Sequence, residues 1–274
     1  MILSLTGGVI AAAMSTRALV AKSIDDRLAH ANPTNGICRF VNYAANAANG
    51  VFELNTNFWA RGIDFSCASP WNDQSGAFRA GTLISKRHII FAKHYPLATG
   101  SRIVFVGEDG GVCACRLVAQ KDIGDRSDIK IGLLDYEVTD NVKPAKILPV
   151  DAERKLGDCS WLPIAMFNRK EHLTVISLAP FPSANGASPG IGCRTSRERS
   201  RVLFEEKVEM GDSGNPAFMV MGKQAILLFC IYGGGCGCGT AVHLCADKIQ
   251  RTMDELCPGY KLERFDFSNV EYGK

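Results

Sequence analysis

The run GTLISKRHIIFAKHYPLATGSRIVFV, residues 81–106, decides the fold class of this chain. It contains three short apolar segments, at 82–85, 88–92 and 102–106, with turn-forming residues between them. Segments of this length, with turn signals about every ten residues, are typical of all-β sandwiches and barrels. The pattern begins near Trp59, and further candidate strands follow at 112–118, 129–134, 173–178, 216–221 and 224–232. We therefore expect an all-β domain.

A helix is expected to close this domain. Apolar residues recur at steps of three and four in the segment 242–257, namely Val242, Cys245, Ile249, Met253 and Leu256. Pro258 and Gly259 then stop the pattern. The helix should pack on the β core, and residues 268–274 should form a tail.

Two segments precede the β pattern. Residues 2–14 are apolar and include the small residues Ala11-Ala12-Ala13, so we favour a signal peptide over residues 1–23 and a secreted or periplasmic protein. The alternative is an N-terminal helix with a polar face from Ser15 to Asp26, which suits a cytoplasmic protein. Residues 24–58 are rich in small and polar residues and predict a linker or pro-region.

The composition excludes several classes of partner and cofactor. The 274 residues are 46% hydrophobic and 22% charged, and the net charge of +3 comes from mixed signs, so neither nucleic acid nor a membrane span is expected. The eleven cysteines include Cys113-x-Cys115 and Cys236-x-Cys238 but no C-x-x-C pair, which favours structural cysteines over metal ligands. The glycines at 233–239 do not form a G-x-G-x-x-G loop, so no nucleotide is expected.

The sequence GDSGNP, residues 211–216, carries the strongest chemical signal. Gly211 and Gly214 flank Ser213, and glycines there let backbone amides approach a substrate carbonyl closely. The nucleophile elbow of α/β-hydrolases needs a glycine two residues after the serine, where this chain has Asn215. We interpret Ser213 as a nucleophile; the alternative is a glycine-rich β-turn.

A serine nucleophile needs a base, and the base needs a carboxylate. His94 ends the second of two short strands, whereas His88 begins that strand and is expected to be a half-buried or surface histidine. Asp128 stands at the mouth of a strongly apolar strand and is our choice of carboxylate. Asp122 and Asp125 are alternatives in a more polar loop, where an aspartate more often caps a turn.

Taken in order, these motifs resemble those of the chymotrypsin-like (trypsin-like) serine peptidases, particularly divergent bacterial members. The order His, Asp, Ser separates this family from subtilisins and α/β-hydrolases. The resemblance covers about residues 59–267. Its motifs are GTLIS with FAKH (81–85 and 91–94), SDI with Leu133 (127–129), and GDSGNP (211–216).

The resemblance implies two packed antiparallel β-barrels of the chymotrypsin type, at about 59–150 and 151–243. His94 and Asp128 would come from the first barrel and Ser213 from the second. His94 would be the general base and then the general acid, Asp128 would fix its tautomer, and the amides of Gly211 and Ser213 would form the oxyanion hole. The implied function is a serine endopeptidase that cleaves protein or peptide substrates through an acyl-enzyme, without a metal or organic cofactor.

Two features of the family are missing. A disulfide normally closes the histidine loop, but the matching positions are about Arg79 and Tyr95. The activation sequence, a basic residue before Ile-Val-Gly-Gly, is also absent, and Arg61-Gly62-Ile63-Asp64 resembles it only weakly. In the family, the aspartate that matches Asp212 usually pairs with the N-terminus that cleavage at the activation sequence releases. Because this chain lacks that sequence, the partner of Asp212 is not predicted.

The resemblance also suggests substrate-binding residues. Lys207 stands six residues before Ser213, often the base of the primary specificity pocket, and would favour an acidic substrate side chain over Lys or Arg. The alternative is a lysine on a solvated loop, or one neutralised by Glu205, Glu206 or Glu209. The strand that pairs with the substrate backbone would contain Tyr232, Gly233 and Gly234.

Two other functions use the same residues. One is a catalytically silent, protease-like binding domain, in which the cleft serves recognition alone. The other is an esterase with the same triad. Intact His94, Asp128 and Ser213 favour an active enzyme.

Overall fold

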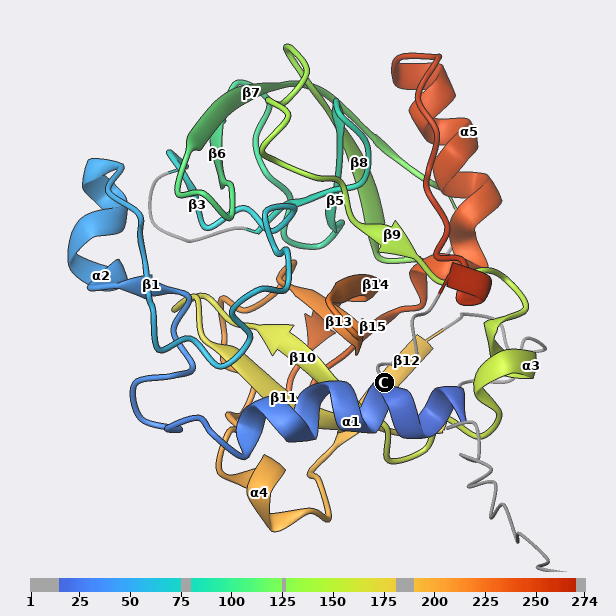
Figure 1. Ribbon diagram of the computed structural model, residues 1–274. Coiled ribbons are helices and arrows are strands. Elements are labelled where there is room, and N and C mark those ends of the chain that lie inside the picture. Colours follow the sequence, from blue (N-terminus) through green and yellow to red (C-terminus); the bar gives the residue numbers. More distant parts are fainter. Residues whose placement is uncertain (1–14, 75–79, 125–126, 181–189, 270–274) are drawn as a thin grey trace, which may run out of the picture.

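The computed structural model describes residues 15–74, 80–124, 127–180 and 190–269. Two sheets lie one above the other, with α5 beside the upper sheet and α1 along the lower one (Figure 1). The chain is mostly β, and it has the helix near its C-terminal end that the sequence predicts. Within the described residues, no helix has the length and apolar character needed to cross a membrane.

The upper sheet is a half-barrel of six antiparallel strands in the order β3-β6-β7-β8-β5-β4. The expected strands 88–92, 102–106 and 129–134 are confirmed, while the strand expected at 112–118 continues to Asp122. The bounds are β3 (Trp71–Asn72), β4 (Thr82–Leu83), β5 (His88–Ala92), β6 (Arg102–Val106), β7 (Val112–Asp122) and β8 (Ile129–Leu134).

The lower sheet closes on itself. Its order is β13-β10-β11-β12-β15-β14, and a β13–β14 pairing completes a six-stranded barrel to which β9 adds in parallel. The expected strands 173–178 and 216–221 are confirmed. The bounds are β9 (Lys146–Ile147), β10 (Pro163–Phe167), β11 (Leu173–Leu178), β12 (Gly190–Arg194), β13 (Pro216–Met221), β14 (Gln224–Gly233) and β15 (Cys238–Thr240).

Aromatic side chains join the two halves. Phe65 lies in the loop before β3, and its ring centroid is 5.3 Å from that of Phe167 on β10 and 5.3 Å from that of Phe218 on β13. All three side chains are buried in one core that includes residues of both sheets. This contact fixes the two halves against each other and so fixes any site between them.

The helix α1 (Thr16–Leu28) packs on β13 and β10. Its buried side chains include Leu19, Val20 and Ile24, and Arg201 forms a two-pronged ion pair with its Asp25. A helix therefore occupies the second part of the segment 1–23; residues 1–14 lie outside the described residues. The other helices are α2 (Tyr43–Asn46), η1 (Ala47–Asn49), α3 (Ala152–Leu156), α4 (Arg199–Val202), η2 (Val242–Cys245), α5 (Ala246–Leu256) and η3 (Phe267–Asn269).

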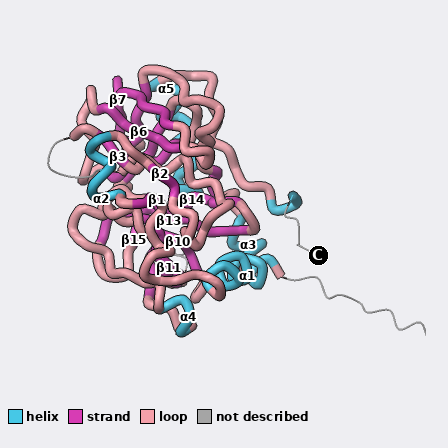
Figure 2. The backbone as a smooth tube through the Cα atoms, turned by 60° about the vertical axis from the view of Figure 1, so that its left-hand side comes forward, coloured by secondary structure: helices cyan, strands magenta, loops and turns pink. Residues whose placement is uncertain are grey.

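Residues 24–58, for which the sequence predicts a linker or pro-region, fold against the rest of the molecule. After α1 the chain forms β1 (Phe40–Val41), α2, η1 and β2 (Glu53–Leu54), and α2 lies beside β3 in Figure 2. A separate cluster explains the docking: aromatic side chains pack on Val104 and Val106 of β6. Phe40, Tyr43 and Phe52 of this segment make the contact, together with Ala47.

Candidate active site

Strand register brings His94 and Asp128 together. In the antiparallel pair β5–β8, Ala92 at the end of one strand lies opposite Ile129 at the start of the other. The residues just beyond these ends must therefore meet, and the Lys93 amide donates to the Asp128 carbonyl at 3.3 Å. The His94 amide then donates to Asp128 Oδ1 at 2.8 Å.

His94 links the carboxylate to the serine. Its Nδ1 lies 2.6 Å from Asp128 Oδ2, and its Nε2 lies 3.0 Å from Ser213 Oγ. Both are hydrogen-bond distances. With the proton on Nδ1, the ring donates to the carboxylate and can accept the serine proton at Nε2. The His94 side chain is 45% exposed, so a substrate can reach this line of atoms.

The loop that carries Ser213 is fixed against both halves. The Gly214 amide donates to the Ile231 carbonyl at 2.7 Å, and the Ile231 amide donates to the Asn215 carbonyl at 2.9 Å. Gly214 has φ +89°, and a Cβ there would lie 3.1 Å from the carbonyl oxygen of Ala80 in the upper half. A glycine is needed for both the backbone conformation and the close approach.

The predicted oxyanion residues lie in the same loop. Gly211 has φ +100°, and the Arg169 side chain packs 3.2 Å from where its Cβ would be. Within the described part of the chain, the amides of Gly211 and Ser213 donate to no acceptor. Two such donors beside a serine are the arrangement that an oxyanion hole requires.

Asp212 has main-chain partners. Its side chain is 1% exposed; Oδ1 accepts from the Arg169 amide at 2.9 Å, and Oδ2 accepts from the Glu209 amide at 2.7 Å. Two amide donors compensate a buried carboxylate. The turn at residues 168–172, between β10 and β11, is therefore part of the site. Sequence reasoning missed it, because the contact joins residues 43 positions apart and uses a backbone amide.

The alternative carboxylates and the alternative histidine do not join this group. Asp122 pairs with Lys93 at 3.0 Å and with Lys130 at 3.5 Å, and Asp125 lies outside the described residues. His88 is fully buried, which corrects the expected half-buried or surface position, because the strand that begins with it is covered on both faces. Its Nδ1 is 2.8 Å from Ser85 Oγ, and burial lowers the pKa of His88 to about 4.

The predicted substrate-binding residues differ in their surroundings. Lys207 is exposed and forms no ion pair with a described residue. Neutralisation by a neighbouring glutamate is not seen, because Glu205 binds Thr195, Glu206 binds His172, and Glu209 binds Arg169. These observations favour the solvated-loop interpretation.

The predicted substrate-pairing strand lies at the end of β14. Tyr232 is exposed, and Gly233 pairs with Cys238 of β15 after a bulge. Gly234 follows directly after the strand. The three residues are therefore placed together on one strand end.

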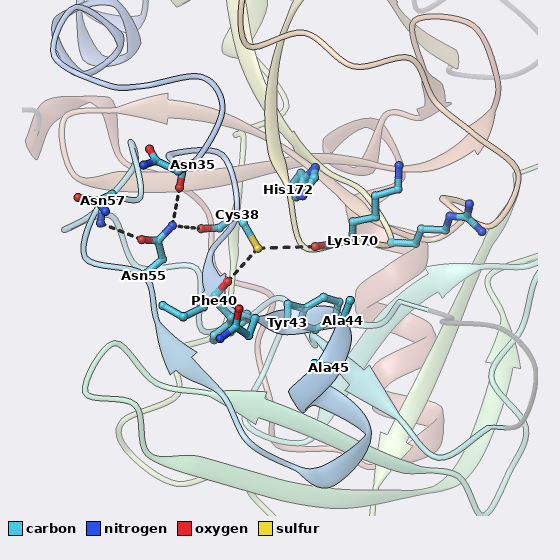
Figure 3. A pocket seen from close by; sticks show the side chains of 13 residues that line it. Asn35, Cys38, Phe40, Tyr43, Ala44, Ala45, Asn55, Asn57, Lys170 and His172 are labelled. Atoms are coloured by element: carbon cyan, nitrogen blue, oxygen red, sulfur yellow. Dashed lines mark hydrogen bonds between the residues drawn. The ribbon is translucent and has the colours of Figure 1, made fainter.

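A cavity of about 780 Å³ lies beside the turn 168–172 (Figure 3). Lys170 and His172 line one side of it, and Asn35, Asn55 and Cys38 line the other. No triad residue lines this cavity, but Arg169 does, and Arg169 also contacts Gly211.

The cysteines do not form a metal site in the described part of the chain, where no group of three or more His, Cys, Asp or Glu is arranged to hold an ion. All eleven lie in the described residues, and no disulfide joins any of them. Cys113 and Cys115 project from the same face of β7, with their sulfur atoms 3.9 Å apart.

No protein-family model matches the chain, and no curated protein sequence is significantly similar to it.

Proposed function

We propose that the protein is a serine endopeptidase with a chymotrypsin-type arrangement of two β halves. The observation that carries this proposal is the His94 ring, which lies within hydrogen-bond distance of both Asp128 and Ser213. The three residues come from three separate loops and from both halves of the molecule. They also occur in the chain order His, Asp, Ser, which distinguishes chymotrypsin-like peptidases from other users of the triad.

In the proposed mechanism, Ser213 Oγ attacks the carbonyl carbon of the peptide bond while His94 Nε2 accepts its proton. Asp128 holds the imidazole by its Nδ1–H and stabilises the imidazolium that forms. The amides of Gly211 and Ser213 receive the oxyanion. His94 then donates its proton to the leaving amine, and the acyl-enzyme forms. In the second half of the reaction, His94 accepts a proton from water, the water oxygen attacks the acyl carbon, and His94 returns the proton to Ser213 Oγ as the acid product leaves.

Labelling with a fluorophosphonate tests the nucleophile. Wild-type protein should react at Ser213, whereas Ser213→Ala should not react. Turnover of a peptide library should fall by up to about 10⁶-fold in Ser213→Ala and in His94→Ala, as in a triad that acts as a unit. Labelling at full strength in Ser213→Ala would contradict the assignment.

The library experiment also separates the two alternative functions. An esterase would be labelled at Ser213 and would cleave activated esters but none of the peptides. A catalytically silent binding domain would show neither labelling nor turnover. Peptide cleavage that depends on Ser213 is the result expected here.

A further inference from the structure

The turn at residues 168–172 is joined to the segment that leads into Ser213 by a series of polar contacts. Arg169 and Lys170 lie 3.1 Å and 3.7 Å from Glu209. The Arg169 amide holds Asp212. Asn168 and His172 both bind Glu206, at 2.6 Å and 3.1 Å. The turn is therefore tied to residues 209–213, here called the oxyanion loop because they carry the amides of Gly211 and Ser213.

Glu171 is the most deeply buried residue of this turn. It is 2% exposed, and its φ of +57° is the left-handed conformation that non-glycine residues rarely adopt. Among the described residues, its Oε2 has no hydrogen-bond partner. It lines a cavity of about 10 Å³ that it shares with Arg169 and Asn215, among others. A space of that size holds about one water molecule, so an ionised carboxylate could not be hydrated there.

The titratable groups around Glu171 offer little compensation for a negative charge. Arg39 is the one cation that acts on it from outside its own turn, and Arg39 already donates to the Val106 carbonyl at 2.8 Å and lies 3.6 Å from Glu108. Tyr43 and Cys38, on the other packed segments, are neutral groups that its charge would disfavour ionising. Within the turn, Arg169 and His172 face Glu209 and Glu206.

Burial raises the pKa of Glu171 from 4.5 to about 7, and Arg39 offsets part of the effect. A side chain released into water would ionise near its ordinary pKa. The released turn therefore loses its proton first as the pH rises, and the docked turn becomes less favoured between pH 4.5 and about pH 7. Above that range the penalty is constant. The equilibrium constant for docking of the turn falls by up to about 300-fold across this interval.

We propose that Glu171 is a positioning residue that keeps the turn 168–172 docked, and with it the oxyanion loop, when it is protonated, and that its ionisation releases the turn. The effect on catalysis rests on the proposed peptidase function, whereas the docking of the turn does not. The side chain acts through Arg169 and Asp212 and does not itself contact the reacting atoms.

The test compares full-length wild type with Glu171→Gln, in which an amide replaces the neutral carboxyl group. Hydrogen exchange is measured on peptides that cover residues 168–172 and 208–213, from about pH 5 to about pH 9, with correction for the intrinsic pH dependence of exchange. The rate of fluorophosphonate labelling of Ser213 is measured over the same range. Glu108→Gln is the matched control, because it removes another carboxylate beside Arg39 without touching the turn.

In wild type and Glu108→Gln, the Glu171 titration should lower the protection of both peptides by no more than about 300-fold as the pH rises to about 7, and its effect should then level off. In Glu171→Gln, the part of this fall that comes from Glu171 should be absent, so the ratio of corrected protection, Glu171→Gln over wild type, should rise with pH, while the His172–Glu206 contact is common to both proteins. The ratio of labelling rates, Glu171→Gln over wild type, should rise with pH. Identical profiles in wild type and Glu171→Gln would overturn the proposal.

A second variant and an independent readout let the experiment decide the role of Glu171 even if one variant does not fold or Ser213 is not labelled. If Glu171→Gln does not fold, Glu171→Met removes the same titration with a side chain of similar length, and the same comparison applies. If Ser213 is not labelled in any variant at any pH, the proposed function fails, but the hydrogen-exchange comparison still decides the role of Glu171.

Discussion

Asp128 makes hydrogen bonds in three directions, and they bind it to both halves of the molecule. Its carboxylate accepts from the His94 amide and faces the His94 ring, and its own amide donates to Thr240 Oγ1 of β15 at 3.3 Å. A carboxylate held in this way selects the imidazole tautomer with the proton on Nδ1. The adjacent nitrogen, Nε2, is then the one available to the serine.

Replacement of Asp128 by Asn should therefore preserve the geometry but select the wrong tautomer. We expect turnover of a peptide substrate to fall about 10⁴-fold, as in the same substitution in a related triad. Steady-state kinetics on the purified variant measures this loss. Asp122→Asn is the control, and it should leave turnover nearly unchanged because Asp122 pairs with lysines. A larger loss in Asp122→Asn than in Asp128→Asn would show that the carboxylate has been misassigned.

A second prediction at this scale concerns Lys207. Because its side chain is exposed and lacks an ion-pair partner among the described residues, Lys207→Ala should leave the cleavage profile across a peptide library unchanged. A preference for Glu or Asp that disappears in the variant would instead place the ammonium in the specificity pocket, where a buried cation attracts a substrate carboxylate. A pocket ammonium would also repel Arg and Lys, so efficient cleavage after those residues would exclude Lys207 from the pocket.

At the scale of elements, α1 is a structural part of the lower barrel. Leu19 and Val20 pack in one core cluster and Ile24 in another, so the helix contributes to both. Arg27 adds a hydrogen bond to the Gly222 carbonyl in the β13–β14 turn. Removal of residues 1–23 would take away Leu19 and Val20, whereas cleavage near Ala13 would leave the helix whole.

Ile24→Ala should lower the free energy of unfolding by about 2–5 kcal/mol, because Ile24 is fully buried and a cavity would remain. Lys22→Ala is the matched control on the exposed face of the same helix. It breaks only the exposed Lys22–Asp26 pair and should change stability by no more than about 0.5 kcal/mol. Denaturant unfolding measures both values. Equal, small effects would mean that α1 is not stably docked.

The elements that the sequence predicted differ physically from those it did not. The strands 88–92, 129–134 and 173–178 consist mostly of apolar and β-branched residues, so the local sequence is enough to predict them. In contrast, β12 has glycines at two of its five positions, β10 starts with a proline, and β15 has three residues. These segments are strands because neighbours in the barrel pair with them, which local propensity does not encode.

The candidate site divides in the same way. The local sequence predicts the three candidate catalytic residues, because Ser213 lies beside glycines and His94 and Asp128 lie at strand ends. The turn 168–172, which donates to Asp212, has no sequence motif that would predict this contact. The burial of Glu171 likewise depends on segments far away in the chain.

At the scale of the whole molecule, the site depends on how two separately built halves meet. Gly214 approaches the Ala80 carbonyl, and Asp128 donates to Thr240, so the serine loop and the aspartate each contact the opposite half. The Phe65, Phe167 and Phe218 rings lie in the core between the halves. A change in this packing would shift the distance between His94 and Ser213 without touching either residue.

This assembly also bears on activation. In the family that the sequence resembles, Asp212 usually pairs with an N-terminus released by cleavage. Here both of its oxygens already accept backbone amides, from Arg169 and Glu209. Arg61 is exposed and is followed by Gly62. Ile63 is already buried, at 1% exposed, so moving it into another pocket after a cut would bury no additional apolar surface. Asp212 therefore already has two hydrogen-bond donors without a released terminus.

We therefore expect Ser213 to react with a fluorophosphonate in the protein whose N-terminus has not been cut between residues 50 and 81. N-terminal sequencing of the labelled protein checks this directly. Arg61→Ala should label at the wild-type rate, because no cut after Arg61 is needed. Arg169→Pro, which removes the amide donor to Asp212, should label more slowly, while Arg169→Ala keeps that amide and controls for loss of the side chain. Labelling that requires a cut after Arg61 and disappears in Arg61→Ala would show that a released terminus, and not the turn 168–172, completes the oxyanion loop.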